Sequence, residues 1–213
     1  MYQNVLLDLD GTLTEPGLGI TNSVAYALEK WNIKVADRTS LYKFIGPPLM
    51  ESFMTFYDFS EEKAAKSVEY YREYFSVKGL YENELYPDTV KLLELLKKSN
   101  KKIVLATSKP EVYAIEILKH FDLYKYFDYV AGATMDETRN KKGDVIKYAL
   151  ESANITELSN TVMIGDREHD IFGAKEAGID SIGVLYGYGN CKELVDAGAT
   201  YIAEKAEDIL CFI

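Results

Sequence analysis

Strand-length apolar runs alternate with helix-length periodic segments along most of this chain, which restricts the folds open to it more than any other feature. The apolar runs lie at 3–9, 102–106, 129–131, 161–164 and 181–185, with a weaker run at 201–203. Between them, apolar residues recur at the three- and four-residue spacing of an α-helix. This alternation predicts βαβ crossovers and a parallel sheet with helices on both faces. In such α/β folds, ligands bind beyond the carboxyl ends of the strands.

The segment 15–83 interrupts this alternation, because it has helical periodicity and no convincing strand. One helical face carries Ile20, Val24, Ala27, Leu28 and Trp31. A second helix is expected after the start signal Ser60-Glu61-Glu62. We therefore predict a core domain of residues 1–14 and 84–213, and an inserted all-helical cap domain of residues 15–83. Because the insertion follows the first strand, we expect it to act as a lid at the ligand edge of the sheet.

The net charge of −10 restricts the partners of the chain. Nucleic acids and anionic membranes are bound through basic surfaces, so we expect neither as a partner. No apolar run approaches the ~20 residues that cross a bilayer. The N-terminus also lacks a basic segment ahead of an apolar one. These features predict a cytoplasmic protein that binds a small ligand.

The segment Asp8-Leu9-Asp10-Gly11-Thr12-Leu13 ends the first predicted strand. A chance match to this pattern in a chain of this size is on the order of a few in ten thousand at ordinary residue frequencies. A turn that merely ends a strand needs only one Asp and a Gly. Two acids flanking one apolar residue at the expected ligand edge therefore indicate chemistry.

Three more polar segments follow in order: Thr107-Ser108-Lys109, the lysine pair Lys141-Lys142, and Gly165-Asp166-Arg167-Glu168-His169-Asp170. Together with the first motif, they resemble the haloacid dehalogenase (HAD) superfamily of phosphatases over the whole sequence. The resemblance implies an α/β, Rossmann-like core and a helical cap. It also implies a magnesium-dependent phosphohydrolase that acts through an aspartyl phosphate.

Phosphate binding is expected from the second and third motifs. Thr107 or Ser108, at a strand end, can cap the next helix and can also donate to a phosphate oxygen. A phosphate beside several carboxylates also needs a cation nearby. Lys141 and Lys142 both precede a predicted helix, so the residues alone leave both open, and the spacing in similar proteins favours Lys142.

The resemblance assigns the metal ligands and the catalytic acids. Mg²⁺ would be held by the Asp8 carboxylate, the Asp10 main-chain carbonyl and the Asp166 carboxylate, with Asp170 ligating directly or through a water. Oxygen ligands suit this hard cation. Asp8 would attack phosphorus, and Asp10 would serve as general acid and then as general base. Arg167 stands where a small hydroxyl residue is common in relatives, and we expect His169 to be structural.

The substrate is expected to be a small phosphorylated metabolite. Ile45-Gly46-Pro47-Pro48 and the segment 183–189 resemble the phosphoglycolate-phosphatase branch, especially members described as 5′-nucleotidases. An aromatic residue of segment 44–57 would then stack on a base, although aromatics at helical spacing more often pack in a core. Phosphoglycolate and sugar phosphates are alternative substrates. A phosphomutase and a non-catalytic, phosphate-responsive binding protein are weaker alternatives.

Overall fold

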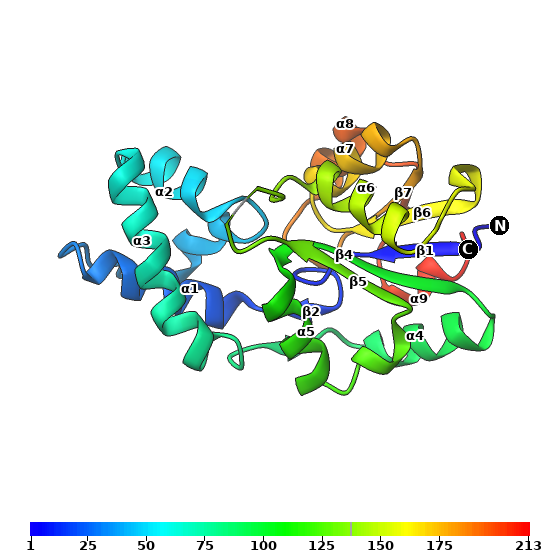
Figure 1. Cartoon of the computed structure of the whole chain (residues 1–213), viewed down its shortest axis with the longest axis horizontal. Helices are drawn as coiled ribbons and strands as arrows, with labels where there is room; N and C mark the ends of the chain where they lie inside the picture. The colour runs from blue at the N-terminus through cyan, green and yellow to red at the C-terminus, as the bar shows by residue number, and fades with distance from the viewer. Residues whose placement is uncertain (137) are drawn as a thin grey trace. The chain divides into compact units, whose positions relative to one another are not determined.

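The computed structural model describes residues 1–136 and 138–213. The chain forms two compact units (Figure 1): Met1–Glu15 with Leu85–Ile213, which we call the core unit, and Pro16–Glu84, which we call the helical unit. That the helical unit acts as a cap stays a prediction. Within the described residues, no helix has both the length and the apolar character needed to cross a membrane.

The core unit is built on a parallel sheet with the strand order β5-β4-β1-β6-β7-β8. The central strand β1 pairs with β4 on one side and with β6 on the other, and its apolar residues are fully buried. The strands span β1 (Asn4–Leu7), β4 (Lys102–Pro110), β5 (Tyr129–Ala133), β6 (Thr161–Gly165), β7 (Asp180–Val184) and β8 (Tyr201–Ala203). The predicted strands are all present, and the predicted α/β fold class is confirmed.

Helices cover both faces of this sheet. Figure 1 shows α6, α7 and α8 on one side and α4, α5 and α9 on the other. On the first side, Val145, Ile146 and Ala149 of α6 pack in one buried cluster with Leu6, Val104 and Met163 of the sheet. The helices span α4 (Thr89–Lys98), α5 (Glu111–His120), η3 (Tyr124–Tyr126), α6 (Lys142–Ser152), η4 (Leu158–Asn160), α7 (Glu168–Ala177), α8 (Cys191–Ala197) and α9 (Ala206–Ile209).

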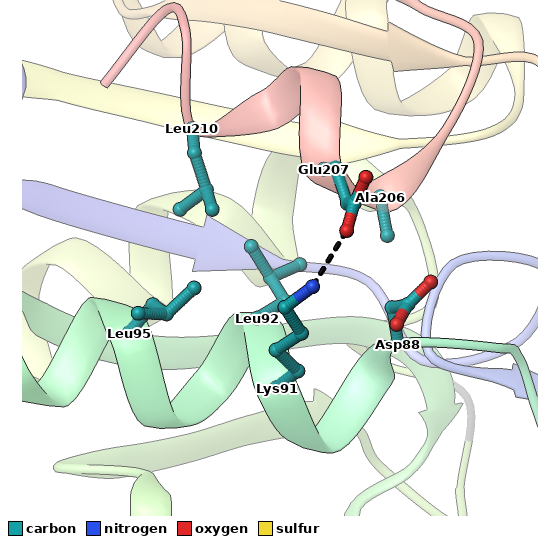
Figure 2. A pocket seen from close by; sticks show the side chains of 7 residues that line it. All are labelled: Asp88, Lys91, Leu92, Leu95, Ala206, Glu207 and Leu210. Atoms are coloured by element: carbon teal, nitrogen blue, oxygen red, sulfur yellow. Dashed lines mark hydrogen bonds and ion pairs between the residues drawn. The ribbon is translucent and has the colours of Figure 1, made fainter.

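The C-terminal helix α9 packs against α4 through an ion pair and apolar side chains. Figure 2 shows Lys91 of α4 paired with Glu207 of α9, with 2.6 Å between Lys91 Nζ and Glu207 Oε1. The small hollow beside this pair is lined by Asp88, Lys91, Leu92, Leu95, Ala206, Glu207 and Leu210. None of the predicted site residues is in this lining, so the hollow is a packing feature of the two helices.

The helical unit is built mainly from helices. Its α3 begins where the start signal predicts, because the Ser60 side chain accepts the backbone N–H of Lys63 at 3.3 Å. The unit comprises α1 (Gly17–Glu29), η1 (Arg38–Phe44), α2 (Leu49–Tyr57), α3 (Glu61–Tyr74) and the π-helical turn η2 (Phe75–Gly79). A separate two-stranded sheet pairs β2 (Thr14–Glu15) with β3 (Glu84–Leu85).

The aromatic residues proposed from the sequence to face a ligand divide into two sets. Phe44 and Phe53 are buried, and their rings meet edge to face with centroids 5.1 Å apart. These two residues therefore pack in a core, which is the alternative that their helical spacing indicates. Phe56 and Tyr57 are half-buried. Part of each of these two side chains stays exposed to solvent, and contact with a ligand stays a prediction.

Candidate active site

The site begins where the central strand ends. Leu7 of β1 is in register with Leu105 of β4 and Ile164 of β6. The N–H of the next residue, Asp8, donates to the carbonyl oxygen of Ile164 at 2.9 Å. Because parallel strands in register end at one edge, Asp8 lies beside the segments that follow Leu105 and Ile164. The sequence motifs therefore meet at the carboxyl edge of the sheet.

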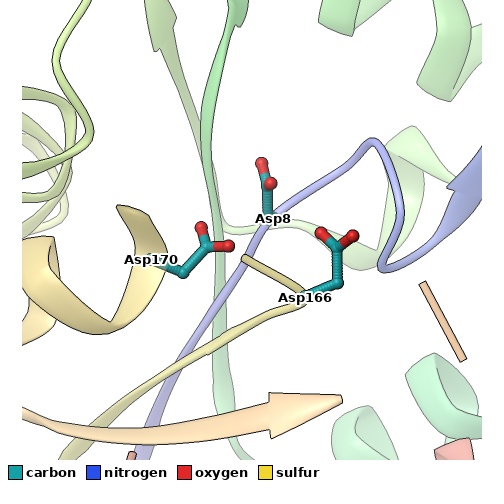
Figure 3. Close-up of side chains that lie close together, drawn as sticks. All are labelled: Asp8, Asp166 and Asp170. Atoms are coloured by element: carbon teal, nitrogen blue, oxygen red, sulfur yellow. The ribbon is translucent and has the colours of Figure 1, made fainter. Parts of the chain in front are cut away.

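Three aspartates converge at this edge (Figure 3). One carboxylate oxygen from each of Asp8, Asp166 and Asp170 lies within 4.8 Å of the others. Asp8 is 7% exposed, Asp166 is 0% and Asp170 is 1%. Asp166 follows β6, and Asp170 lies in the first turn of α7. The structure thus brings together three of the four predicted metal ligands by their side chains.

Lys142 brings a positively charged ammonium group into this cluster. Its Nζ lies 2.8 Å from Asp8 Oδ1 and 2.7 Å from Asp170 Oδ1. It also donates to the carbonyl oxygen of Ala106 at 3.1 Å. Lys142 is the first residue of α6 and is buried, whereas Lys141 is exposed. Of the two lysines left open by the sequence, Lys142 is therefore the one that reaches the site.

Burial and neighbouring charges shift the pKa values of Asp166, Asp170 and Lys142. Burial, with the neighbouring charges of Asp170 and Asp8, raises the pKa of Asp166 well above its usual range. Burial also raises the pKa of Asp170, against the opposing influence of Lys142. For Lys142, burial lowers the pKa, but the Asp170 and Asp8 carboxylates outweigh it and the net shift is upward. The cluster is therefore short of positive charge.

The cluster fits a divalent cation. When all three carboxylates are ionised, they and one ammonium group leave an excess of two negative charges. Asp166 Oδ1 is buried and has no hydrogen-bond partner among the described residues. Hard divalent cations such as Mg²⁺ prefer carboxylate oxygens. These observations support a buried acidic group that could hold a metal.

Asp10 occupies a different environment from the other three acids. Its Oδ2 lies 2.6 Å from Lys109 Nζ, and the side chains are 13% and 5% exposed. Burial raises the pKa of Asp10, while Lys109 acts in the opposite direction. The Asp10 carboxylate is not part of the acidic group around Asp166. The structure therefore separates one acid, paired with its own lysine, from the cluster.

Lys109 is a site residue that the sequence analysis missed. Lys109 ends the Thr107-Ser108-Lys109 motif, in which only Thr107 and Ser108 are expected to act. The signal that could have found it is its place in a continuous buried strand, because a buried lysine needs an acidic partner. β4 continues to Pro110, with a register shift between Ala106 and Pro110, and this extension carries Lys109 to Asp10.

The expected capping role of Thr107 or Ser108 is wrong. The N-cap of α5 is Pro110, and it has no side-chain cap hydrogen bond. The segment stays extended instead of turning into the helix, and Thr107 Oγ1 accepts the N–H of Lys109 at 3.2 Å. Thr107 is buried and Ser108 is half-buried. Both lie on the extension of β4, and their role toward phosphate stays a prediction.

Arg167 has a structural role in this arrangement. Its Nε lies 2.8 Å from Glu193 Oε1, and its backbone N–H donates to Asp170 Oδ2 at 3.1 Å. The second contact is a backbone hydrogen bond that holds one carboxylate oxygen of Asp170. His169 is not a member of the acidic group, and its structural role stays a prediction.

Known proteins of one family are similar to this chain over most of its length. Residues 5–184 match the family model described as haloacid dehalogenase-like hydrolase. A 5′-nucleotidase of Pseudomonas aeruginosa is 45% identical over 193 residues, which cover 91% of this chain and 87% of that protein. The tyrosine-protein kinase PtkA of Mycobacterium tuberculosis is 35% identical over 97% of this chain and 70% of its own length.

A solved structure gives the same result. The crystal structure of a predicted phosphatase from Clostridium acetobutylicum superposes with a TM-score of 0.95 and is 48% identical, covering 98% of this chain and 96% of that one. The predicted family, fold class and enzyme class are confirmed by these matches. The chain therefore belongs to the haloacid dehalogenase-like hydrolase family.

Proposed function

We propose that this hydrolase is a magnesium-dependent phosphomonoesterase for small metabolites, with nucleoside 5′-monophosphates as its leading substrates. The observation that carries the proposal is the excess of negative charge around Lys142. Three buried carboxylates gather there, and Lys142 contacts two of them, Asp8 and Asp170. Such an arrangement is unfavourable unless a cation offsets it, since each like-charged pair at ~4 Å costs about 4 kcal/mol at an effective dielectric constant of 20.

The Asp8, Asp166 and Asp170 carboxylates and the Asp10 main-chain carbonyl would hold the magnesium ion. When bound, the ion supplies positive charge that offsets the charges of the phosphate and the carboxylates. Lys142 contacts two of these acids. Its remaining hydrogen-bonding capacity suits an oxygen of the transferring phosphate, as do the hydroxyls of Thr107 and Ser108.

Asp8, in the acidic cluster, and Asp10, beside Lys109, then have separate roles in the reaction. A carboxylate oxygen of Asp8 attacks phosphorus, the phosphorus bond to the leaving oxygen breaks, and an aspartyl phosphate forms. Asp10 gives its proton to the leaving alkoxide. In the second half, the Asp10 carboxylate takes a proton from water, which attacks phosphorus and releases Asp8 and inorganic phosphate. Lys109, 2.6 Å from Asp10, would hold this acid in place in both halves.

The preference for nucleotides rests on similarity and on a few aromatic residues. The P. aeruginosa relative is named a 5′-nucleotidase, and it matches most of this chain. Phe56 and Tyr57 are the half-buried aromatics of α2 and are suited to contact a base. Phosphoglycolate and sugar phosphates are the alternatives. Transfer to a hydroxyl acceptor, as in a phosphomutase, is less favoured.

The test is phosphate release from nucleoside monophosphates, phosphoglycolate and sugar phosphates, each with magnesium or with a chelator. We expect metal-dependent release that is fastest with nucleotides and is abolished by Asp8→Asn. Asp144→Asn is the matched control, because Asp144 is an exposed carboxylate in the first turn of α6. Release that persists in Asp8→Asn contradicts the nucleophile. Equal rates for all substrates contradict the nucleotide preference, and no release at all favours a binding protein.

A further inference from the structure

The loop between β7 and α8 lies directly against Asp166. In this loop, the backbone N–H of Tyr188 donates to Asp166 Oδ2 at 2.7 Å. The other oxygen, Oδ1, is buried and has no hydrogen-bond partner among the described residues. The protein thus holds one oxygen of this carboxylate with a main-chain donor and leaves the other for a cation.

Glycines on both sides of Tyr188 permit this close approach. A Cβ atom on Gly187 would lie 2.3 Å from the carbonyl oxygen of Gly11 and 2.4 Å from Asp166 Cβ. A Cβ atom on Gly189 would lie 2.0 Å from the carbonyl oxygen of Asp166. Neither glycine has a positive φ. Glycine is therefore needed at both positions because a Cβ atom would collide with Asp166 or Gly11, and not because the backbone is unusual.

The phenols of this loop attach it to the segment that follows Asp10. Tyr188 Oη donates to the carboxylate of Glu15. Tyr186 Oη donates to the carbonyl oxygen of Thr12 at 3.1 Å. The same loop therefore contacts Asp166 through its backbone and residues 12–15 through its side chains.

We propose that Tyr188 is a positioning residue: its phenol, anchored on Glu15, holds the N–H that orients Asp166 for metal binding. The inference rests on the proposed magnesium site. Tyr188 acts through Asp166, and its ring can be kept while its anchor is removed. Substitution of groups that orient a metal ligand typically weakens metal affinity ~10- to 100-fold.

The test is calorimetric titration of MgCl2 into substrate-free protein, with the thermal midpoint measured in parallel. We expect Tyr188→Phe and Glu15→Ala each to weaken magnesium binding about 10-fold. The double variant should lose no more magnesium affinity than either single variant, because both changes break the same interaction. Tyr126→Phe is the matched control, since its hydroxyl donates to Glu94 at 3.3 Å elsewhere in the core unit. We expect this control to bind magnesium like the wild type.

Unchanged affinity in both single variants, or additive losses in the double variant, overturns the inference. If Tyr188→Phe does not fold, Glu15→Ala still decides it, because the same anchor is removed from the other side. Asp166→Asn separates the two proposals. Equal magnesium binding by the wild type and Asp166→Asn refutes the proposed metal site itself, whereas loss in Asp166→Asn with no change in Tyr188→Phe and Glu15→Ala refutes only the positioning role.

Discussion

Two buried lysines meet the acids of this site in different ways. Lys142 contacts Asp8 and Asp170 in a group that also contains Asp166, so negative charge exceeds positive charge. Lys109 contacts Asp10, and this pair carries one charge of each sign. An unbalanced group attracts a cation, whereas a balanced pair fixes a carboxyl group without one. We infer that the first environment is suited to metal binding and the second to proton transfer.

The largest expected effect separates Asp8 from Asp10. With p-nitrophenyl phosphate, whose leaving group needs no proton, Asp10→Asn should release about one equivalent of nitrophenol in a burst. Turnover should then be ~10²- to 10⁴-fold slower than wild type, because the second half lacks its base. Asp8→Asn should show no burst and a loss of at least about 10⁴-fold. Stopped-flow absorbance measures both, and a burst from Asp8→Asn contradicts the division of roles.

The two lysines should also differ in their effect on stability. Lys142→Met leaves two buried carboxylates without their cation, which we expect to lower the free energy of unfolding by about 3–5 kcal/mol. Lys109→Met leaves one, with an expected loss of about 1–3 kcal/mol. Urea denaturation in chelator at pH 7 measures both variants. Equal losses would show that the charge excess around Lys142 is not a feature of the folded protein.

Magnesium should stabilise the unbalanced group specifically. At a concentration 100 times its dissociation constant, a ligand of the native state adds about 2.7 kcal/mol. We expect this gain in the wild type and in Lys109→Met, and little of it in Asp166→Asn. Urea midpoints with magnesium and with chelator provide the measurement. A gain of the same size in Asp166→Asn is the contrary result.

The smallest expected effect is a pH dependence in chelator. Because burial raises the pKa of Asp166 above its unfolded value, its share of the stability is present at low pH. That share is lost as the pH rises from the unfolded value of about 3.9 through the raised folded value. Over this window, Asp166→Asn should flatten the slope by up to about 1.4 kcal/mol per pH unit. Parallel slopes for wild type and variant would mean that Asp166 is not perturbed.

The sequence was sufficient for the fold because periodicity reports burial directly. The strand runs and helical faces are consequences of which side of each element is buried, so β1, β6 and α7 lie where the residue pattern predicts. The motif aspartates were likewise found from their place after apolar runs. Their convergence then followed from the geometry of a parallel sheet.

The rest of the site depends on contacts that no local pattern encodes. The pairing of Lys109 with Asp10 needs the extension and register shift of β4, which places a lysine where a helix cap was expected. Asp166 accepts a hydrogen bond from a main-chain N–H, so the residue type at position 188 does not indicate this contact. The residues alone left Lys141 and Lys142 open and only similarity to other proteins favoured Lys142, which is the lysine that contacts Asp8 in the structure.

The division of the core unit into two chain segments also has a consequence for folding during synthesis. The helical unit is a single continuous segment, Pro16–Glu84, so its contacts can form as soon as it leaves the ribosome. Strand β1 is made before β4 and β6, with which it pairs, and Asn4 reaches its contact with Thr161 across 157 residues. Its apolar edge must therefore stay unpaired until most of the chain has been synthesised. We expect this strand, although central in the finished sheet, to be the segment most in need of protection from aggregation in the nascent protein.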